Sequence, residues 1–401
     1  MNPAAGQLFF RSAPDTSNAV IVNLEAYQGS GGLDNEFLGY FVKGGQIPLT
    51  LREDISSGLQ DINYAGGEYR GSLSYVFHPD SLFGKPTDIG LVVSYTIHEV
   101  ASIRFSQSTY DLVFLGNESY LNDTLDLSDL LFDNQAFTKL SLGYVHPSGK
   151  FSAEIGLVGG QRFNRLSLSK GQIISNPTGS FLNYSLEGNY NRNSNSRTIT
   201  DFQGAGLSLD LRYDFTVTTL SNKGTPLVIR GELSDLGFIS WNASSEHTVI
   251  NSAGTFDGLT INSFENANET IEEQIEAIED TLVPRSSAGR DITLLPTTLT
   301  LGTLPGLNDS RRLEPLIGVR VRMAQTFIPS LMIGMHYQPV SAFAVQLIGN
   351  YGGYGNLQLG IGTYLSLGKH FHWRLYSNAI INSFMKNGTG HSLNTAFVMS
   401  W

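Results

Sequence analysis

Alternation of apolar and polar residues is the dominant pattern of the last part of the chain, from Leu316 to Trp401. A period of two places alternate side chains on opposite faces of a strand, so each segment has one apolar and one polar face. The pattern predicts five consecutive strands joined by tight turns. Their apolar faces carry, segment by segment, Val319, Val321 and Met323; Phe343, Val345 and Leu347; Leu357, Leu359, Ile361, Leu365 and Leu367; Phe371, Trp373, Leu375, Ala379 and Ile381; and Leu393, Phe397, Met399 and Trp401.

The apolar face of each strand points outward in a membrane barrel and inward in a soluble fold. The strands are about nine to eleven residues long, as a tilted membrane-crossing strand requires. Their other face carries Arg, His, Gln and Gly, which suits a polar lumen better than a dry core. The chain ends on Trp401 with Phe397 four residues earlier, and this ending resembles the assembly signal on the last strand of outer-membrane barrels. We expect an outward apolar face, with a soluble β-sandwich or lipocalin-like barrel as the alternative.

The rest of the chain extends this pattern less regularly. Strands are predicted for Asn18 to Tyr27, Glu36 to Lys43, Tyr69 to Phe77 and Ile89 to Ile97, and a short amphipathic helix within Ile47 to Ala65. The fold class expected is all-β, a transmembrane antiparallel barrel of about fourteen strands, with twelve or sixteen as alternatives. Residues 1–401 then form a single domain that begins with an irregular N-terminal segment, residues 1–16.

Loop lengths predict the sidedness of the barrel, because periplasmic turns are short and the last strand ends in the periplasm. Gly368 to His370, Gln338 to Ala342 and Leu220 to Thr225 fall on the periplasmic side, with both termini. Long connections fall outside the cell, roughly at Glu99 to Gln135, Asn189 to Gln203 and Asn242 to Leu295.

The longest of these connections contains an acidic amphipathic helix, predicted for residues 266–282. Ile271, Ile275, Ile278 and Leu282 recur at helical spacing among six acidic residues, and Pro284 ends the helix. Two interpretations stay open for its apolar stripe: a lid on the barrel mouth, or a surface for a partner protein.

Composition fits a barrel and excludes several other classes. The 401 residues include 43 Gly, 23 Phe, 17 Tyr and no Cys, so disulfides and cysteine chemistry are absent. A net charge of −11 argues against a nucleic-acid partner, which would require a basic surface. No run of apolar residues is long enough for a transmembrane helix. Asn2-Pro3-Ala4 after Met1 shows no signal-peptide pattern, so we expect the numbering to begin near a processed end.

Charges of both signs are predicted to face the lumen. The set comprises Asp210, Arg212, Asp214, Arg230, Glu232, Arg320, Arg322, His372 and Arg374, with Ser208 and His336 beside them. They could line a selective path or form a salt-bridge network that fills the lumen, and their mixed sign favours the network. Because Asp210, Arg212, Asp214, Arg230 and Glu232 lie on neighbouring strands, we expect them to pair with one another.

Enzymatic chemistry has little support in the sequence. There is no nucleophile elbow and no His-Glu-x-x-His motif, and His370 with His372 and His336 is a weak metal pattern. We expect no catalytic, metal-binding or cofactor-binding residues, and no cofactor.

Short motifs along nearly the whole chain give a resemblance to a known family. They are Asn2-Pro3-Ala4, Pro79 to Lys85, Leu112 to Asn117, Asp235 to Ile239, Leu295-Pro296 and Tyr351 to Gly355. The chain resembles an uncharacterised outer-membrane barrel family of Bacteroidota, which is similar to the FadL-like, PorV and PorP/SprF barrels associated with type IX secretion and gliding. The resemblance implies fourteen strands and an N-terminal segment that enters the lumen. It implies no catalytic residue, and the longer N-terminal pattern of PorP/SprF is missing here.

The function predicted from these features is that of an integral outer-membrane barrel. We expect a non-enzymatic accessory or scaffold subunit that works with other envelope proteins and contacts outer-membrane lipid. The alternative is a FadL-like channel for hydrophobic or small solutes. A channel needs a continuous path or a lateral opening, whereas a scaffold can be sealed.

Overall fold

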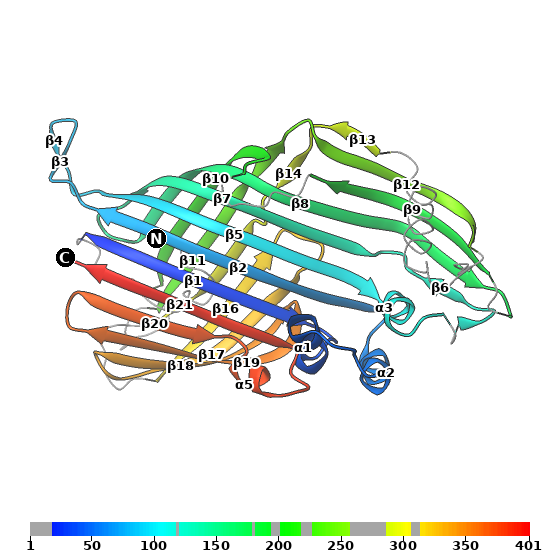
Figure 1. The fold of residues 1–401 in the computed structure, drawn as a ribbon. Coiled ribbons are helices and arrows are strands. Elements are labelled where there is room, and N and C mark those ends of the chain that lie inside the picture. Colours follow the sequence, from blue (N-terminus) through cyan, green and yellow to red (C-terminus); the bar gives the residue numbers. More distant parts are fainter. Residues whose placement is uncertain are drawn as a thin grey trace.

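A single antiparallel sheet closes on itself to form a barrel of fourteen strands, in agreement with the predicted fold class (Figure 1). The computed structural model describes residues 18–117, 120–178, 181–193, 201–217, 227–256, 286–305 and 313–401. In order around the ring, the strands are β1 (Ala19–Ser30), β2 (Ile62–Phe77), β5 (Gly90–Ser106), β7 (Leu131–Val145), β8 (Phe151–Ser175), β10 (Gly204–Val217), β11 (Leu227–Trp241), β15 (Thr298–Leu304), β16 (Leu313–Arg322), β17 (Ile328–Val340), β18 (Phe343–Gly353), β19 (Gly355–Leu367), β20 (Phe371–Ser377) and β21 (Gly390–Ser400).

The barrel closes where the last strand pairs with the first. The β1–β21 ladder runs without interruption from Ala19 opposite Ser400 to Gly29 opposite Gly390. Trp401 extends this seam, because its backbone N–H donates to the Asn18 carbonyl and its ring stacks on Tyr75 of β2. The last residue therefore ties the closing strand to both of the first two strands.

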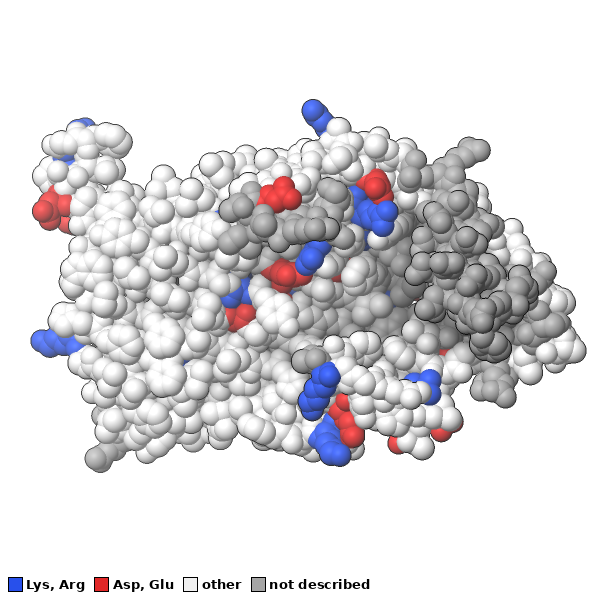
Figure 2. Space-filling model, in the orientation of Figure 1, with Lys and Arg blue, Asp and Glu red and all other residues white. Residues whose placement is uncertain are grey.

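The alternation predicted for the C-terminal region describes its faces correctly. On β21, Phe397 is 37% and Trp401 53% exposed on the outside, whereas Asn394, Ala396 and Val398 are buried inside. Large exposed apolar side chains cover the outer face of the other strands in the same way. Figure 2 shows a broad uncharged area toward the end of the barrel that holds Asn18 and Trp401. A closed ring with an apolar exterior is the form in which a sheet can span a membrane.

Two details of the C-terminal prediction are wrong. The region contains six strands instead of five, because β17 also belongs to it. The strand that begins at Phe371 ends at Ser377, and residues up to Ile381 do not continue it. Ile381 lies in the short helix α5 (Ile380–Phe384), which connects β20 to β21.

The segment from Glu36 to Lys43, predicted as a strand, is the helix α1 (Asn35–Lys43). Its ends explain the difference: the Asp34 carboxylate accepts a hydrogen bond of 2.8 Å from the Phe37 N–H, and Gly44 ends the helix at a φ of 74°. These capping contacts outweigh a short apolar run that also fits a strand. The helix predicted within Ile47 to Ala65 is α2 (Leu49–Gly58), and β2 already begins at Ile62.

One side of the barrel extends well beyond the ring. β8 is 25 residues long; its first half pairs with β10 and its second half with β9 (Leu182–Arg192). β12 (Ser245–Phe256) continues the line of β11 and pairs with β9, and the short strands β13 (Ser286–Gly289) and β14 (Ile292–Leu294) lead back to the ring. The described residues of the stretch from Asn242 to Leu295, predicted as one long connection, are therefore mostly sheet. The predicted loop from Glu99 to Gln135 is also shorter, because β5 runs to Ser106 and β7 begins at Leu131.

The two ends of the barrel differ in their connections. Short turns at 146–150, 341–342 and 368–370 lie at the end that holds Asn18 and Trp401. The helices α1, α2, α3 (Gln107–Phe114) and α5, with the short strand β6 (Thr124–Asp126), lie toward the opposite end (Figure 1). No helix among the described residues is long and apolar enough to cross a membrane.

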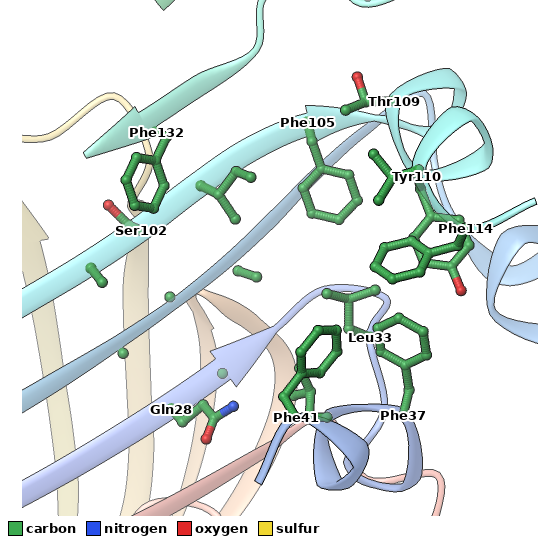
Figure 3. A pocket seen from close by; sticks show the side chains of 18 of the residues that line it. Gln28, Leu33, Phe37, Phe41, Ser102, Phe105, Thr109, Tyr110, Phe114 and Phe132 are labelled. Carbon is green, nitrogen blue, oxygen red and sulfur yellow. The ribbon is translucent and has the colours of Figure 1, made fainter. Parts of the chain in front are cut away.

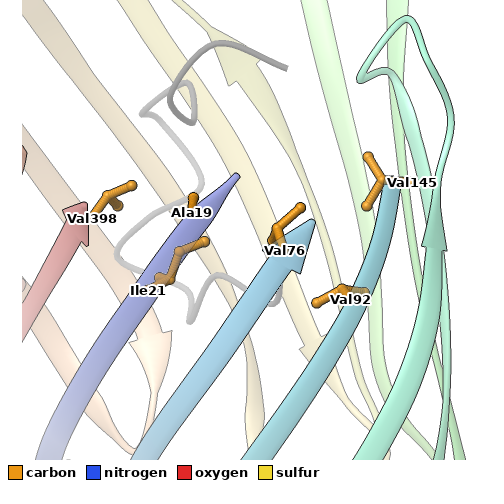
Figure 4. Close-up of a cluster of buried hydrophobic side chains, with 6 residues drawn as sticks. All are labelled: Ala19, Ile21, Val76, Val92, Val145 and Val398. Atoms are coloured by element: carbon orange, nitrogen blue, oxygen red, sulfur yellow. The ribbon is translucent and has the colours of Figure 1, made fainter. Parts of the chain in front are cut away.

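The inner face is not uniformly polar, contrary to expectation. Figure 4 shows a hydrophobic cluster at the end that holds Asn18 and Trp401. It consists of the inward side chains of Ala19, Ile21, Val76, Val92, Val145 and Val398. A second cluster lies toward the helical end and contains Phe137, Val158, Phe163, Ile239, Trp241 and Leu295. Buried charges occupy the inner face between them.

Candidate functional site

A layer of buried charges crosses the lumen. Alternate residues of the strands point inward, so each strand contributes one or two members. The members of this charged layer are Glu68 and Arg70 on β2, His98 on β5, Lys139 on β7, Asp210 on β10, Asp235 on β11, and Arg320 and Arg322 on β16, and each is at most 8% exposed.

Two ion pairs of the layer join opposite sides of the barrel. The Glu68 carboxylate accepts hydrogen bonds from Arg322 and, at 3.3 Å, from Arg320. β2 and β16 are seven strands apart in either direction around the ring, so these contacts span the lumen. Arg322 also donates to the Tyr354 hydroxyl at 2.9 Å, and Tyr354 is fully buried. Direct side-chain contacts therefore cross the lumen at this level.

Asp235 is the second centre of the layer. Its carboxylate pairs with Arg70 at 3.1 Å and with Lys139, which also bonds Asp210 at 2.7 Å. His98 lies between the two centres, 2.8 Å from a Glu68 oxygen and 3.4 Å from an Asp235 oxygen. Removing charges from water is costly unless they are paired, and this continuous arrangement pairs them.

A β-bulge places Asp235 inside the barrel. The register between β10 and β11 shifts between Leu209 and Leu211, and Asp235 has a φ of 57°. The Asp235 N–H donates to the Asp210 carboxylate at 2.8 Å, and Thr297 donates to the Asp235 carbonyl at 2.8 Å. The bulge changes which residues of β11 point inward. Alternation counted forward from Arg230 and Glu232 therefore does not predict that Asp235 faces the lumen.

The predicted luminal residues lie inward, but only some pair as expected. Arg230 forms two hydrogen bonds with Asp214, at 2.7 and 2.9 Å, and lies 3.7 Å from Glu232. Asp210, in contrast, pairs with Lys139, and Arg212 donates to the Gly149 carbonyl at 3.0 Å. Arg230 thus pairs with Asp214 and Glu232 as expected, whereas the expectation is wrong for Asp210, which belongs to the charged layer with Lys139 and Asp235.

Of the remaining predicted residues, some belong to the charged layer and others lie elsewhere on the inner face. Arg320 and Arg322 belong to the charged layer, whereas His372 bonds the Tyr364 hydroxyl at 2.9 Å and Arg374 is buried on the same strand. His336 bonds Gln346 at 3.2 Å. In the part of the chain that the structure describes, no three His, Cys, Asp or Glu side chains are grouped to hold a metal ion. Sequence reasoning missed Glu68, Arg70, His98, Lys139 and Asp235, although Arg70 and His98 occupy inward positions of strands that alternate well.

An apolar groove of about 730 Å³ lies on the outer wall, toward the helical end. Helices α1 and α3 form one side, and the outward faces of β1, β2, β5 and β7 form the other (Figure 3). Its aromatic lining residues are Phe37, Phe41, Tyr69, Phe105, Tyr110, Phe114 and Phe132. Small residues such as Ala65, Gly67 and Ala101 form the floor and leave the space open.

The helices beside the groove are held by a buried carboxylate. Asp111 of α3 accepts hydrogen bonds from Ser56 of α2 and from Tyr120. Burial, together with this hydrogen bond, raises the pKa of Tyr120 to about 12. The hydroxyl therefore remains a donor above its ordinary pKa as well, and this contribution to stability is lost only as pH rises through about 12.

A second pocket, of about 410 Å³, lies on the outer wall next to the groove and shares Tyr69 with it. A third, of about 460 Å³, opens inside the mouth between β14 and the turn that follows β16. Its lining includes Asp133 and Arg165, which are paired at 2.8 Å, and reaches Arg322 of the charged layer. This pocket therefore extends from the mouth to the charged layer.

Three predicted features lie outside the described residues. They are the N-terminal segment 1–16, the turn from Leu220 to Thr225, and the loop helix 266–282 with Ile271, Ile275, Ile278 and Leu282. All three stay predictions.

Residues 162–375 match the family model described as "Family of unknown function (DUF5723)". The match covers more than half of the chain. The chain belongs to this family. No curated protein matches this chain.

Several solved barrels are similar to this DUF5723 protein. The toluene transporter TodX of Pseudomonas putida has 12% identity and a TM-score of 0.42, with 97% of this chain and 91% of that chain covered. A FadL homologue of Pseudomonas aeruginosa has 9% identity and a TM-score of 0.38, with 96% and 89% covered. The translocator domain of the autotransporter NalP from Neisseria meningitidis has 10% identity and a TM-score of 0.32, with 98% and 91% covered. None of these likenesses says what the DUF5723 protein binds.

Proposed function

We propose that this protein is a non-enzymatic outer-membrane barrel that is closed to solutes and acts as an accessory subunit of a cell-envelope complex. The observation that carries the proposal is the pairing of Glu68 on β2 with Arg320 and Arg322 on the opposite strand β16. A solute path through the lumen would have to separate buried, paired charges. Leaving either partner unpaired is costly, so the closed state is strongly favoured.

The experiment is extraction of the native membrane in mild detergent, followed by native electrophoresis and mass spectrometry. We expect the chain to migrate with a defined set of other envelope proteins, in a complex larger than the barrel alone. A barrel that migrates alone after extraction, while a known complex of the same membrane stays intact, would contradict the accessory role.

A second candidate function is uptake of apolar solutes, as in the FadL-like alternative, and the outer groove favours it. Gly29, Gly66 and Ser102 lie side by side across β1, β2 and β5, so the wall behind the groove is thin. The Tyr354 ring closes it from inside, since a Cβ on Gly66 would lie 2.6 Å from that ring. Entry from the groove would require Tyr354 to move.

Filling the groove tests this candidate. Ala101→Phe places a ring in the groove from β5, whereas Val93→Phe on the same outward face of β5 lies outside it. If the protein takes up apolar solutes through the groove, Ala101→Phe lowers uptake of a fluorescent apolar probe by intact cells and Val93→Phe does not. Equal uptake by both variants and by a deletion strain would exclude this function.

A further inference from the structure

The connection between β2 and β5 forms a projecting hairpin with an exposed aromatic tip. Its strands β3 (Ser81–Leu82) and β4 (Lys85–Pro86) pair with each other and with no other part of the described sheet. The hairpin stands away from the barrel at the end that holds Asn18 and Trp401 (Figures 1 and 2). Phe83 at its tip is 96% exposed.

The tip has an unusual backbone for its sequence. Phe83 and Gly84 are the two central residues of the turn and have φ values of 52° and 77°. Positive φ at both positions is typical of a type I′ turn, which favours Asn-Gly. A bulky aromatic residue rarely adopts this conformation, so Phe83 is not the residue that turn stability alone would select.

The hairpin is ordered without packing on the barrel. Thr87 N–H donates to the Asp80 carbonyl at 3.1 Å and closes its base, and Pro79 and Pro86 restrict the backbone on both sides. A backbone that is already restricted loses little conformational freedom on binding. The hairpin therefore presents Phe83 on a pre-organised backbone.

We infer that Phe83 inserts into an apolar pocket of another envelope protein, on the membrane side that holds Asn18 and Trp401. This inference rests on the proposed accessory function and locates one contact of the complex. Exposed Asp80 and Asp88 lie at the base of the hairpin, and exposed Lys85 follows the turn. With two carboxylates and one lysine the hairpin has a net negative charge, which disfavours a lipid surface, because such a surface would select Lys and Arg.

Two variants separate binding from folding. Phe83→Asn suits the turn and removes the anchor, whereas Phe384→Asn removes a ring that is 84% exposed on α5, at the opposite end. We expect Phe83→Asn to keep or raise the thermal midpoint of the purified barrel. We also expect it to weaken assembly of the native complex about tenfold or more, as loss of an interface anchor does. Phe384→Asn should leave assembly unchanged.

A photocrosslinker identifies what the tip touches. With Phe83→p-benzoylphenylalanine in intact cells, we expect an adduct with the same protein that extraction finds in the complex. Adducts with lipid alone, or a complex unaffected by Phe83→Asn, would overturn the inference and leave the accessory function standing. Absence of any complex for the unchanged protein would overturn both.

Discussion

At the scale of single residues, Glu68 is the position on which closure of the lumen depends. It is buried and accepts hydrogen bonds from Arg320 and Arg322, so Glu68→Ala leaves two buried cations without this partner. We expect a loss of about 3–5 kcal/mol in the free energy of unfolding. Adding Arg322→Ala should cost much less than it does alone, because the pair is already broken.

Urea unfolding in lipid vesicles measures this coupling, and an exposed pair serves as the control. Arg192 and Glu246 lie 2.6 Å apart on β9 and β12, with side chains 49% and 42% exposed. Their coupling should stay below about 1 kcal/mol. Strict additivity for Glu68 and Arg322 would show that they do not act as a buried pair.

Trp401 is the second decisive residue. Its ring stacks on Tyr75 with centroids 6.1 Å apart, and its N–H donates to the Asn18 carbonyl at 3.0 Å. Deleting Trp401 removes both contacts from the closing seam, so the amount of heat-modifiable barrel in the membrane should fall several-fold. Met399→Ala, which changes another outward side chain of β21, is the control. Full levels of folded barrel after the deletion would refute the assembly role.

The inward direction of single residues was largely predictable, and the exceptions have a physical cause. Strict alternation places Asp210, Arg212, Arg230 and Glu232 on the inner face, as observed. Asp235 could not be assigned in this way, because a bulge with a positive φ changes the phase of β11. Pairing across the lumen also depends on which strands lie opposite each other, and local sequence does not contain this information.

At the scale of elements, the groove depends on how α1 is held. The Asp34 carboxylate caps α1, and Phe37 and Phe41 of that helix line the groove. Asp34→Ala should destabilise the helix by about 1 kcal/mol. Hydrogen exchange of the amides of α1 should then be faster, while exchange in β1 and β2 stays unchanged. Glu53→Ala, on the exposed face of α2, is the control, and equal exchange in both variants would contradict the capping role.

Elements were predictable where one face is apolar and the other polar. The regular strands of the ring satisfy this condition, since one side meets lipid and the other the lumen. β9 and β12 do not, because their residues beyond the ring alternate only weakly and are largely polar, as in the run Asn189-Tyr190-Asn191-Arg192. The short apolar run of α1 fits a strand as well as a helix. Its caps, Asp34 and Gly44, are the features that indicate the helix.

At the scale of the whole molecule, paired charges cross the middle of the barrel and its two ends differ. One end holds Asn18, Trp401, short turns and the hairpin of Phe83, and the other holds the helices, the groove and the extended sheet. Mixed luminal charge was predicted, and in the structure it forms a continuous layer instead of a ring of one sign. A sealed barrel with features at both ends suits a subunit that other proteins contact.

Single-channel conductance in planar bilayers tests this account most directly. The purified barrel should show no steady conductance, because Glu68 and Arg322 close the lumen from opposite strands. The double variant Glu68→Ala/Arg322→Ala should conduct measurably, whereas Arg192→Ala/Glu246→Ala should stay silent. Steady open-channel currents from the unchanged protein, at a level that the Glu68 and Arg322 variants do not alter, would contradict the sealed barrel.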